Sequence, residues 1–238
     1  MRTQSEETDL HRDAACRFAS SLAARSDVQA VLLAGSVARR DHCGSSDVDL
    51  LVVGTADDIP FRQVVDSLLV ECIVHDEAAW LERYRRPATS WSYAFLDAVV
   101  LQETNGAGAR LVRAAHRAID EYRAPEPLRR ELATRLWHGQ AKLDRAAEAD
   151  TLTQAYWAGI YVEVIFDALF TVHDVPLPAG ARRLAHLDRV PLTAEERRLL
   201  EQLLMDSPRA RFSALTALNA HLRNQLGPVE HEEQGPSE

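Results

Sequence analysis

The first half of the chain alternates short apolar runs with segments of helical pattern. The apolar runs are rich in β-branched residues and are bounded by turn formers, which is typical of strands. They lie at 28–34, 49–53, 68–74 and 98–101. Segments of helical composition or spacing lie at 7–24, 60–66, 77–84 and 106–122. This alternation predicts an α/β or α+β domain with one small mixed sheet, which we place at residues 1–123.

The pattern changes after Pro125 and Pro127, because no further strand with clean alternation follows. The remaining periodic segments are helical. They lie at 128–148, 151–170, 193–205 and 208–226. The second is so apolar that it indicates the buried centre of a bundle, and Thr193 with Glu196 three residues later is a capping-box pattern. We expect a helical bundle domain at 124–226 and a disordered acidic tail at 227–238.

Composition narrows the class of protein. The 238 residues are 46% hydrophobic and 26% charged, which is ordinary for a globular chain. The net charge of -9 disfavours nucleic acid as the partner, because gripping a phosphate backbone usually needs a basic surface. Three widely spaced cysteines fit neither a disulfide framework nor a metal knuckle. With no signal-peptide pattern and no run of 18 apolar residues, we expect a cytoplasmic protein without a membrane partner.

Residues 31–53 carry the most informative chemistry. A predicted strand leads to Gly35-Ser36, and a second one opens with Asp47-Val48-Asp49. Alternation along a strand places Asp47 and Asp49 on one face, about 7 Å apart at their backbones. Two such carboxylates repel each other unless a cation lies between them, and Mg²⁺ prefers such oxygen ligands. Gly35 lets a triphosphate approach the backbone, and Ser36 can donate hydrogen bonds to it.

The string GSVARRDHCGSSDVDL at 35–50 resembles the signature of the minimal nucleotidyltransferases of the DNA polymerase β superfamily. The matching positions are Gly35, Ser36, Ala38, Arg39, Ser46, Asp47, Asp49 and Leu50. Arg40 departs from the pattern, since the family usually has glycine there, and this leaves the turn after Arg39 open. The competing interpretation is a glycine turn followed by two solvent-facing aspartates on an edge strand.

The resemblance implies a third carboxylate on a neighbouring strand, for which we choose Glu71. A charged residue inside the apolar run 68–74 is costly unless a cation compensates it. The alternative is an edge-strand glutamate that reaches solvent or an arginine, and Asp76 and Asp97 are competing candidates. By resemblance, two Mg²⁺ ions are held by Asp47, Asp49 and Glu71.

The same resemblance implies the residues that bind the nucleoside triphosphate, which we take to be ATP. They are Gly35, Ser36, Arg39, Ser46 and Arg183. Arg183 comes from the helical half, where a lysine or arginine commonly serves this purpose in the family. A solvated surface charge is the alternative interpretation of Arg183.

The helical half resembles that of aminoglycoside and lincosamide nucleotidyltransferases, which bind the acceptor between a catalytic and a helical domain. Residues 161–184 are similar to their helix and Pro-Gly loop followed by a basic residue. Glu163 and Asp167 lie four positions apart and so share one helix face. They are our candidates for binding a polyamine-like acceptor. The alternative is that both acids pair with nearby arginines.

These observations predict a Mg²⁺-dependent adenylyltransferase that moves AMP from ATP to a hydroxyl of a small molecule and releases pyrophosphate. An aminoglycoside-like antibiotic is the acceptor suggested by resemblance, which would make the protein a resistance enzyme. Glu71 and Glu163 are alternative general bases. Two other hypotheses remain: a nucleotidyltransferase that modifies a protein or RNA in a toxin–antitoxin pair, and a nucleotide-binding module without catalysis. The identity of the acceptor and the choice between monomer and homodimer stay open.

Overall fold

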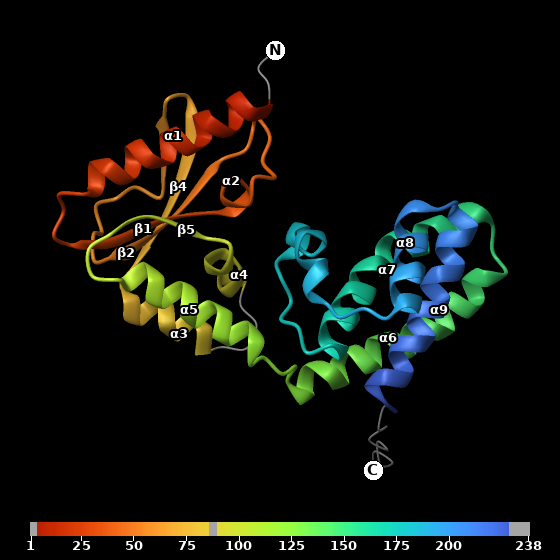
Figure 1. Cartoon of the computed structure of the whole chain (residues 1–238). Helices are drawn as coiled ribbons and strands as arrows, with labels where there is room; N and C mark the ends of the chain where they lie inside the picture. The colour runs from red at the N-terminus through yellow and green to blue at the C-terminus, as the bar shows by residue number, and fades with distance from the viewer. Residues whose placement is uncertain (1–3, 86–89, 229–238) are drawn as a thin grey trace, which may run out of the picture. The chain divides into compact units, whose positions relative to one another are not determined.

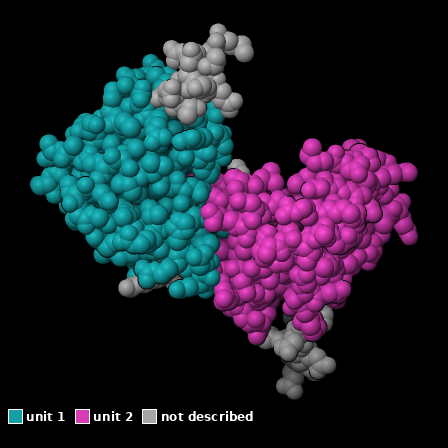
Figure 2. All heavy atoms as spheres, viewed as in Figure 1, with its two compact units in different colours: residues 1–121 teal, residues 122–238 magenta. Residues whose placement is uncertain are grey.

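The computed structural model describes residues 4–85 and 90–228, and its chain path is drawn in Figure 1. The chain divides into two compact units, residues 1–121 and 122–238 (Figure 2). The first unit contains a sheet and the second is helical, so the predicted fold class is confirmed. Most of the predicted tail, from residue 229 onward, lies outside the described residues.

The first unit is built on a five-stranded mixed sheet in the order β3-β4-β2-β1-β5. The strands are β1 Val28–Ala34, β2 Val48–Gly54, β3 Arg62–Val65, β4 Leu68–His75 and β5 Val99–Glu103. The β2 and β4 strands are parallel, whereas the other neighbours are antiparallel. All four predicted strands are present, and β3 is an additional one.

Helices cover both faces of this sheet (Figure 1). The helix α1 (Gln4–Leu22) packs through Phe18 on the face that contains Leu33 and Leu50. The other face, with Leu51, packs against a cluster that includes Trp80. That cluster is supplied by α3 (Glu77–Arg85), α4 (Ser90–Leu96) and α5 (Ala107–Asp120). Burial on both faces explains why the central strands are continuously apolar rather than alternating.

The segment 60–66 differs from the sequence prediction. The predicted helix is wrong, because Arg62–Val65 forms β3 and pairs with β4. Asp66 and Ser67, with φ of 50° and 69°, link the paired Val65 and Leu68, as in a two-residue hairpin turn with left-handed residues. The sequence did not indicate this turn, because the segment has a helical composition and neither Asp66 nor Ser67 is the glycine that is common in such turns. The hairpin places Arg62 directly opposite Glu71.

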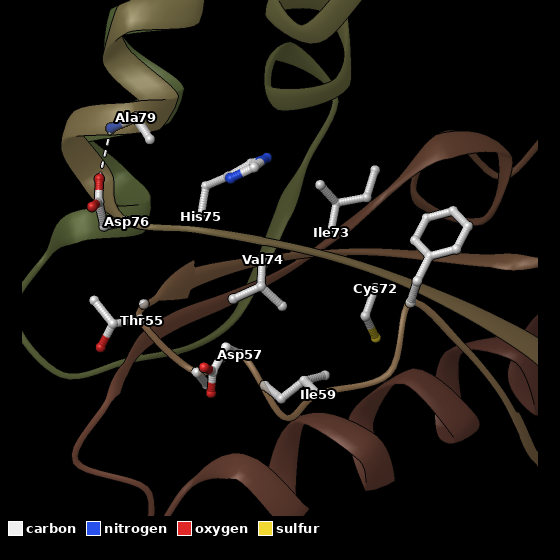
Figure 3. Close-up of a pocket in the computed structure, with 12 residues that line it drawn as sticks. Thr55, Asp57, Ile59, Cys72, Ile73, Val74, His75, Asp76 and Ala79 are labelled. Carbon is white, nitrogen blue, oxygen red and sulfur yellow. Dashed lines mark hydrogen bonds between the residues drawn. The ribbon is translucent and has the colours of Figure 1, made fainter.

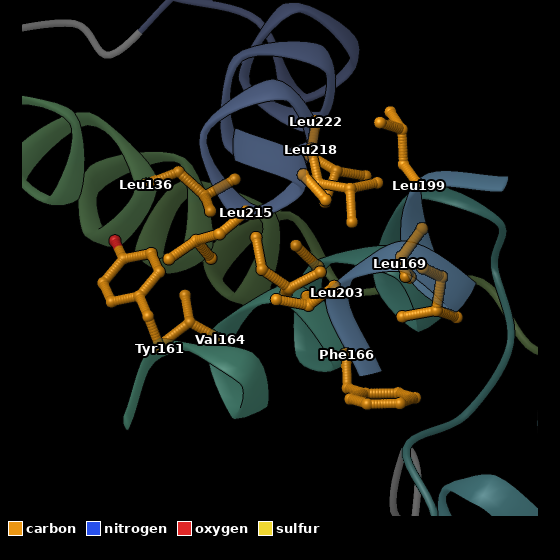
Figure 4. Close-up of a cluster of buried hydrophobic side chains, with 14 of the residues drawn as sticks. Leu136, Tyr161, Val164, Phe166, Leu169, Leu199, Leu203, Leu215, Leu218 and Leu222 are labelled. Atoms are coloured by element: carbon orange, nitrogen blue, oxygen red, sulfur yellow. The ribbon is translucent and has the colours of Figure 1, made fainter. Parts of the chain in front are cut away.

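The second unit is a bundle of α6 (Glu126–Ala147), α7 (Thr151–Val172), α8 (Ala194–Met205) and α9 (Pro208–Leu226). Short 3₁₀ turns at Gly180–Arg182 and Leu184–Arg189 lie between α7 and α8. Buried leucines join the helices, and Figure 4 shows Leu136, Leu169, Leu203 and Leu215 among them. The predicted capping box at Thr193 and Glu196 is confirmed.

The helix α7 is the bundle element with the strongest apolar character. Within the described residues it is long and apolar enough to cross a membrane by length and composition, with a mean hydropathy of 1.4 in its most apolar window. Half of that window is buried inside the protein, where α7 packs against α6 and α9. This packing accounts for the composition of α7, as the sequence pattern predicted.

Candidate active site

Three carboxylates converge at the start of β2, beside the middle of β4. One carboxylate oxygen from each of Asp47, Asp49 and Glu71 lies within 4.8 Å of the other two, and all three residues are partly buried. Asp49 and Glu71 are paired across the parallel strands, and Asp47 directly precedes β2 on the same face as Asp49. The structure therefore brings together the three residues that the sequence predicted as metal ligands.

The competing carboxylates have other partners. Asp76 caps α3, since its Oδ1 accepts a hydrogen bond of 2.7 Å from the backbone N–H of Ala79. Asp97 lies 4.0 Å from a guanidinium nitrogen of Arg39. Neither belongs to the cluster found among the described residues. Geometry therefore selects Glu71 as the third carboxylate.

The cluster has the donor chemistry of a divalent-cation site. Carboxylate oxygens this close repel each other unless positive charge compensates them. Hard cations such as Mg²⁺ take oxygen ligands and retain positions for water and phosphate oxygens. Asp47, Asp49 and Glu71 therefore fit a metal ion of this class.

Gly35 lies directly against the cluster. It has a φ of +68°, and an added Cβ would lie 1.8 Å from Oδ2 of Asp49 and 2.8 Å from its Cγ. The β1–β2 pairing brings the chain this close, because Ala34 is the cross-strand partner of Asp49. Glycine is therefore needed here to make room for the Asp49 carboxylate, a reason that the sequence did not reveal.

The turn after Gly35 resolves the departure from the family pattern at Arg40. Gly35–Arg39 forms the short helix α2, and Arg40 follows it in the left-handed region with φ of 65° and ψ of 27°. Its backbone N–H bonds to the carbonyls of Ser36 and Val37. The turn keeps a conformation that suits glycine, although arginine stands there.

Arg39 and Ser46 lie at the two ends of the loop that joins α2 to Asp47. Arg39 Nε donates to Oδ2 of Asp41 at 3.0 Å, and its side chain is only 18% exposed. The Oγ atom of Ser46 accepts a 3.0 Å bond from the N–H of Cys43, which closes a tight turn before Asp47. Both predicted triphosphate ligands are thus held by local polar contacts.

A buried histidine of α1 also contacts this loop. His11 Nε2 lies 3.2 Å from the carbonyl oxygen of Ser46, immediately before Asp47. The His11 ring also packs against His42, with 4.7 Å between the ring centroids, and both histidines are buried. Sequence reasoning missed His11, because no local spacing connects it with a loop 35 residues away.

Arg62 is the second residue that sequence reasoning missed. Its Nε donates a 2.6 Å hydrogen bond to Oε1 of Glu71. The Arg62 side chain is 63% exposed, whereas that of Glu71 is 16% exposed. Glu71 therefore belongs to the acidic cluster and also pairs with an arginine, although β4 is not an edge strand.

The predicted acceptor acids and Arg183 meet within the second unit. Arg183 lies 2.7 Å from Oδ1 of Asp167 and 3.7 Å from Oε2 of Glu163, and Arg135 lies 3.7 Å from Oδ2 of Asp167. Burial raises the pKa of Asp167 above its ordinary value, and the charges of Arg183 and Arg135 oppose that rise. The pairing agrees with the alternative that both acids bind arginines, although Glu163 remains 73% exposed.

A cavity of about 460 Å³ lies beside the end of β2 and the second half of β4. Residues from Gly54 to Phe61 and from Cys72 to Ala79 contribute to its lining. Figure 3 shows Asp57 and Ile59 of the loop after β2 near Val74 of β4. Gly54 is five positions beyond Asp49, a distance of roughly 16 Å along a strand. None of the three cluster carboxylates lines this cavity among the described residues, although its lining includes Cys72, which directly follows Glu71.

Comparisons with known proteins identify no family for this chain. No family model matches the chain, and no curated protein matches it. Ten solved chains match. One is a nucleotidyltransferase-like protein from Exiguobacterium sibiricum, which is 18% identical, with the match covering 90% of this chain and 74% of that one. Its TM-score of 0.33 is too low to carry an argument.

Proposed function

We propose that this protein is a Mg²⁺-dependent nucleotidyltransferase that transfers AMP from ATP to a hydroxyl of a small molecule. The observation that carries the proposal is the convergence of Asp47, Asp49 and Glu71 beside Gly35. The motif at 35–50, which resembles that of minimal nucleotidyltransferases, supports the same reaction. Carboxylates beside a Gly-Ser turn suit a substrate that brings both phosphate oxygens and their metal.

Each residue has a distinct part in the proposed reaction. Asp47 and Asp49 act as ligands that hold the metal, and Glu71 completes the set. Two bound Mg²⁺ ions would neutralise negative charge on the phosphates and favour ionisation of the acceptor hydroxyl. The backbone N–H and hydroxyl of Ser36 donate to phosphate oxygens, and Arg39 and Ser46 are the further triphosphate ligands.

The chemical step is an in-line displacement at the α-phosphorus. The acceptor hydroxyl oxygen forms a bond to phosphorus while the bond to the bridging oxygen breaks. Pyrophosphate leaves with the electron pair of that bond. The hydroxyl proton passes to the carboxylate of Glu71, or to Glu163 as the alternative base.

For the acceptor, we propose a cationic small molecule of the aminoglycoside type. The support is the resemblance of residues 161–184 to antibiotic nucleotidyltransferases and the exposed carboxylate of Glu163. Arg183 is our proposed triphosphate ligand from the second unit. Binding of phosphate would then require Arg183 to exchange its contact with Asp167 for one with the substrate.

The test is transfer of label from α-labelled ATP to a panel of aminoglycosides in the presence of Mg²⁺, with release of pyrophosphate as a second readout. Asp47→Asn and Asp49→Asn should each lower the rate by at least about 100-fold, because each removes a metal ligand. Asp57→Asn removes an exposed carboxylate of the same unit outside the cluster and serves as the matched control. Full activity in both Asp47→Asn and Asp49→Asn would refute the proposal. Transfer of the label to a protein or RNA would show that the acceptor is not a small molecule.

A further inference from the structure

The Glu71 carboxylate contacts a cation supplied by the chain itself. Arg62 donates from Nε to Oε1 of Glu71 at 2.6 Å. The two residues are cross-strand partners in the β3–β4 hairpin, whose register is set by the turn at Asp66-Ser67. The ion pair is therefore specified by the sheet and is not an incidental surface contact.

The arginine can leave this position more easily than the glutamate can. Arg62 is 63% exposed and lies on β3, an edge strand of the sheet, whereas Glu71 is 16% exposed on β4 between β3 and β2. Because the guanidinium is exposed, Arg62 regains water when it leaves Glu71. The cost of separation falls mainly on the less exposed Glu71 carboxylate, unless a cation takes the place of the arginine.

A metal ion and the Arg62 guanidinium compete for the same ligand. Oε1 of Glu71 already accepts a charge-assisted hydrogen bond, so the arginine takes up one of the positions on this oxygen at which a cation could bind. A divalent cation at the cluster would also repel the nearby guanidinium, since both are positive. The arginine and the metal therefore oppose each other at Glu71.

We propose that Arg62 regulates the metal site by occupying Oε1 of Glu71 when no metal is bound, and that it moves away from this oxygen when a cation binds at the cluster. This inference rests on the proposed function. In the metal-free protein, Arg62 neutralises part of the charge of the three carboxylates and holds Glu71 in place. The exchange raises the metal concentration at which the site fills.

The test is a titration of the full chain with Mn²⁺ alone, in which electron paramagnetic resonance measures the concentration of free Mn²⁺. Arg62→Gln should tighten Mn²⁺ binding about two- to tenfold, since it removes both the competing bond and the repulsion. The matched control is Arg110→Gln, which removes an arginine paired with Glu77 elsewhere in the same unit and should leave the affinity unchanged. Thermal unfolding verifies that each variant is folded, and Arg62→Met replaces Arg62→Gln if the latter does not fold.

A double-mutant cycle separates competition at Glu71 from a general effect of charge. Glu71→Gln should weaken Mn²⁺ binding, and adding Arg62→Gln to it should then change the affinity less than twofold. An equal gain from Arg62→Gln in both backgrounds, or no gain in the wild-type background, would overturn the role of Arg62. If wild type and Arg62→Gln both fail to bind Mn²⁺, the metal site and the Arg62 proposal fall together. Binding that requires Asp47 and Asp49 but ignores Arg62 removes the Arg62 proposal alone.

Discussion

Oδ2 of Asp49 lies 1.8 Å from the position that a Cβ on Gly35 would occupy. Gly35 directly follows β1 and begins α2, so the backbone at this junction packs against the Asp49 carboxylate at the start of β2. Because Gly35 has no side chain, the Gly35-Ser36 turn that we expect to bind phosphate can lie directly against Asp49, a predicted metal ligand. The Gly-Ser and Asp-x-Asp parts of the motif therefore depend on each other.

Gly35→Ala should weaken Mn²⁺ binding by roughly 10- to 100-fold, in the range seen when the support of a metal ligand is lost. The added methyl group displaces the Asp49 carboxylate, and alanine is strained at a φ of +68°. Mn²⁺ titration measures the affinity, and circular dichroism verifies the fold. An unchanged affinity in a folded variant would show that Asp49 is not a ligand in its present position.

Arg40→Gly should raise the free energy of unfolding by about 1 kcal/mol, because arginine is strained in the left-handed region and glycine is not. Urea unfolding of the two proteins measures the difference. The Arg40 side chain is exposed and belongs to no proposed contact with substrate, so Mn²⁺ affinity should not change. A less stable glycine variant would mean that the arginine side chain contributes more than the strain costs.

Glu196→Gln should destabilise the helical unit in a pH-dependent manner. Burial acts to raise the pKa of Glu196, but hydrogen bonds from Thr193 and the neighbouring His173 and His221 lower it to about 2 from an ordinary value of 4.5. A lowered pKa contributes stability that is present above pH 4.5 and is lost as the pH falls toward 2. We expect a loss of roughly 3 kcal/mol at pH 7.

Urea unfolding of wild type and Glu196→Gln at pH 7 and at pH 3 measures this dependence. The difference between the two proteins should shrink at the lower pH, because at pH 3 the unfolded wild-type chain binds a proton at Glu196 that the folded chain largely does not. The Glu196 side chain is fully buried, so its partners are left without an acceptor charge in the variant. A difference that stays constant between the two pH values would contradict the assigned pKa.

Gly139→Ala and Gly159→Ala should have opposite effects, although both positions are helical. A Cβ at Gly139 would lie 1.7 Å from the hydroxyl oxygen of Tyr161, so we expect a loss of about 2 kcal/mol or more from overpacking. A Cβ at Gly159 would have no atom within 4 Å apart from its own stretch of helix, and alanine should stabilise α7 by roughly 0.5–1 kcal/mol. Thermal unfolding measures the stability of the two variants. Equal effects would show that Tyr161 does not pack tightly against Gly139.

Local patterns in the sequence predicted much of the architecture. Strand-length apolar runs located β1, β2, β4 and β5. In β1 and β2 the signal is nearly uninterrupted because these strands are buried on both faces. Helical periodicity located α6 to α9, and the capping box marked the start of α8. The β3 strand was missed, since its four residues are half exposed and its turn lacks glycine.

The sequence by itself determined the carboxylate chemistry, because Asp47 and Asp49 are two positions apart and strand alternation puts them on one face. Tertiary structure alone decided that Glu71 joins them, that Gly35 lies against Asp49, and that Arg62 pairs with Glu71. These three relationships depend on strand order and register. Pairing between strands is set by packing across the whole sheet and by the β3–β4 turn, so no local spacing along the chain encodes it.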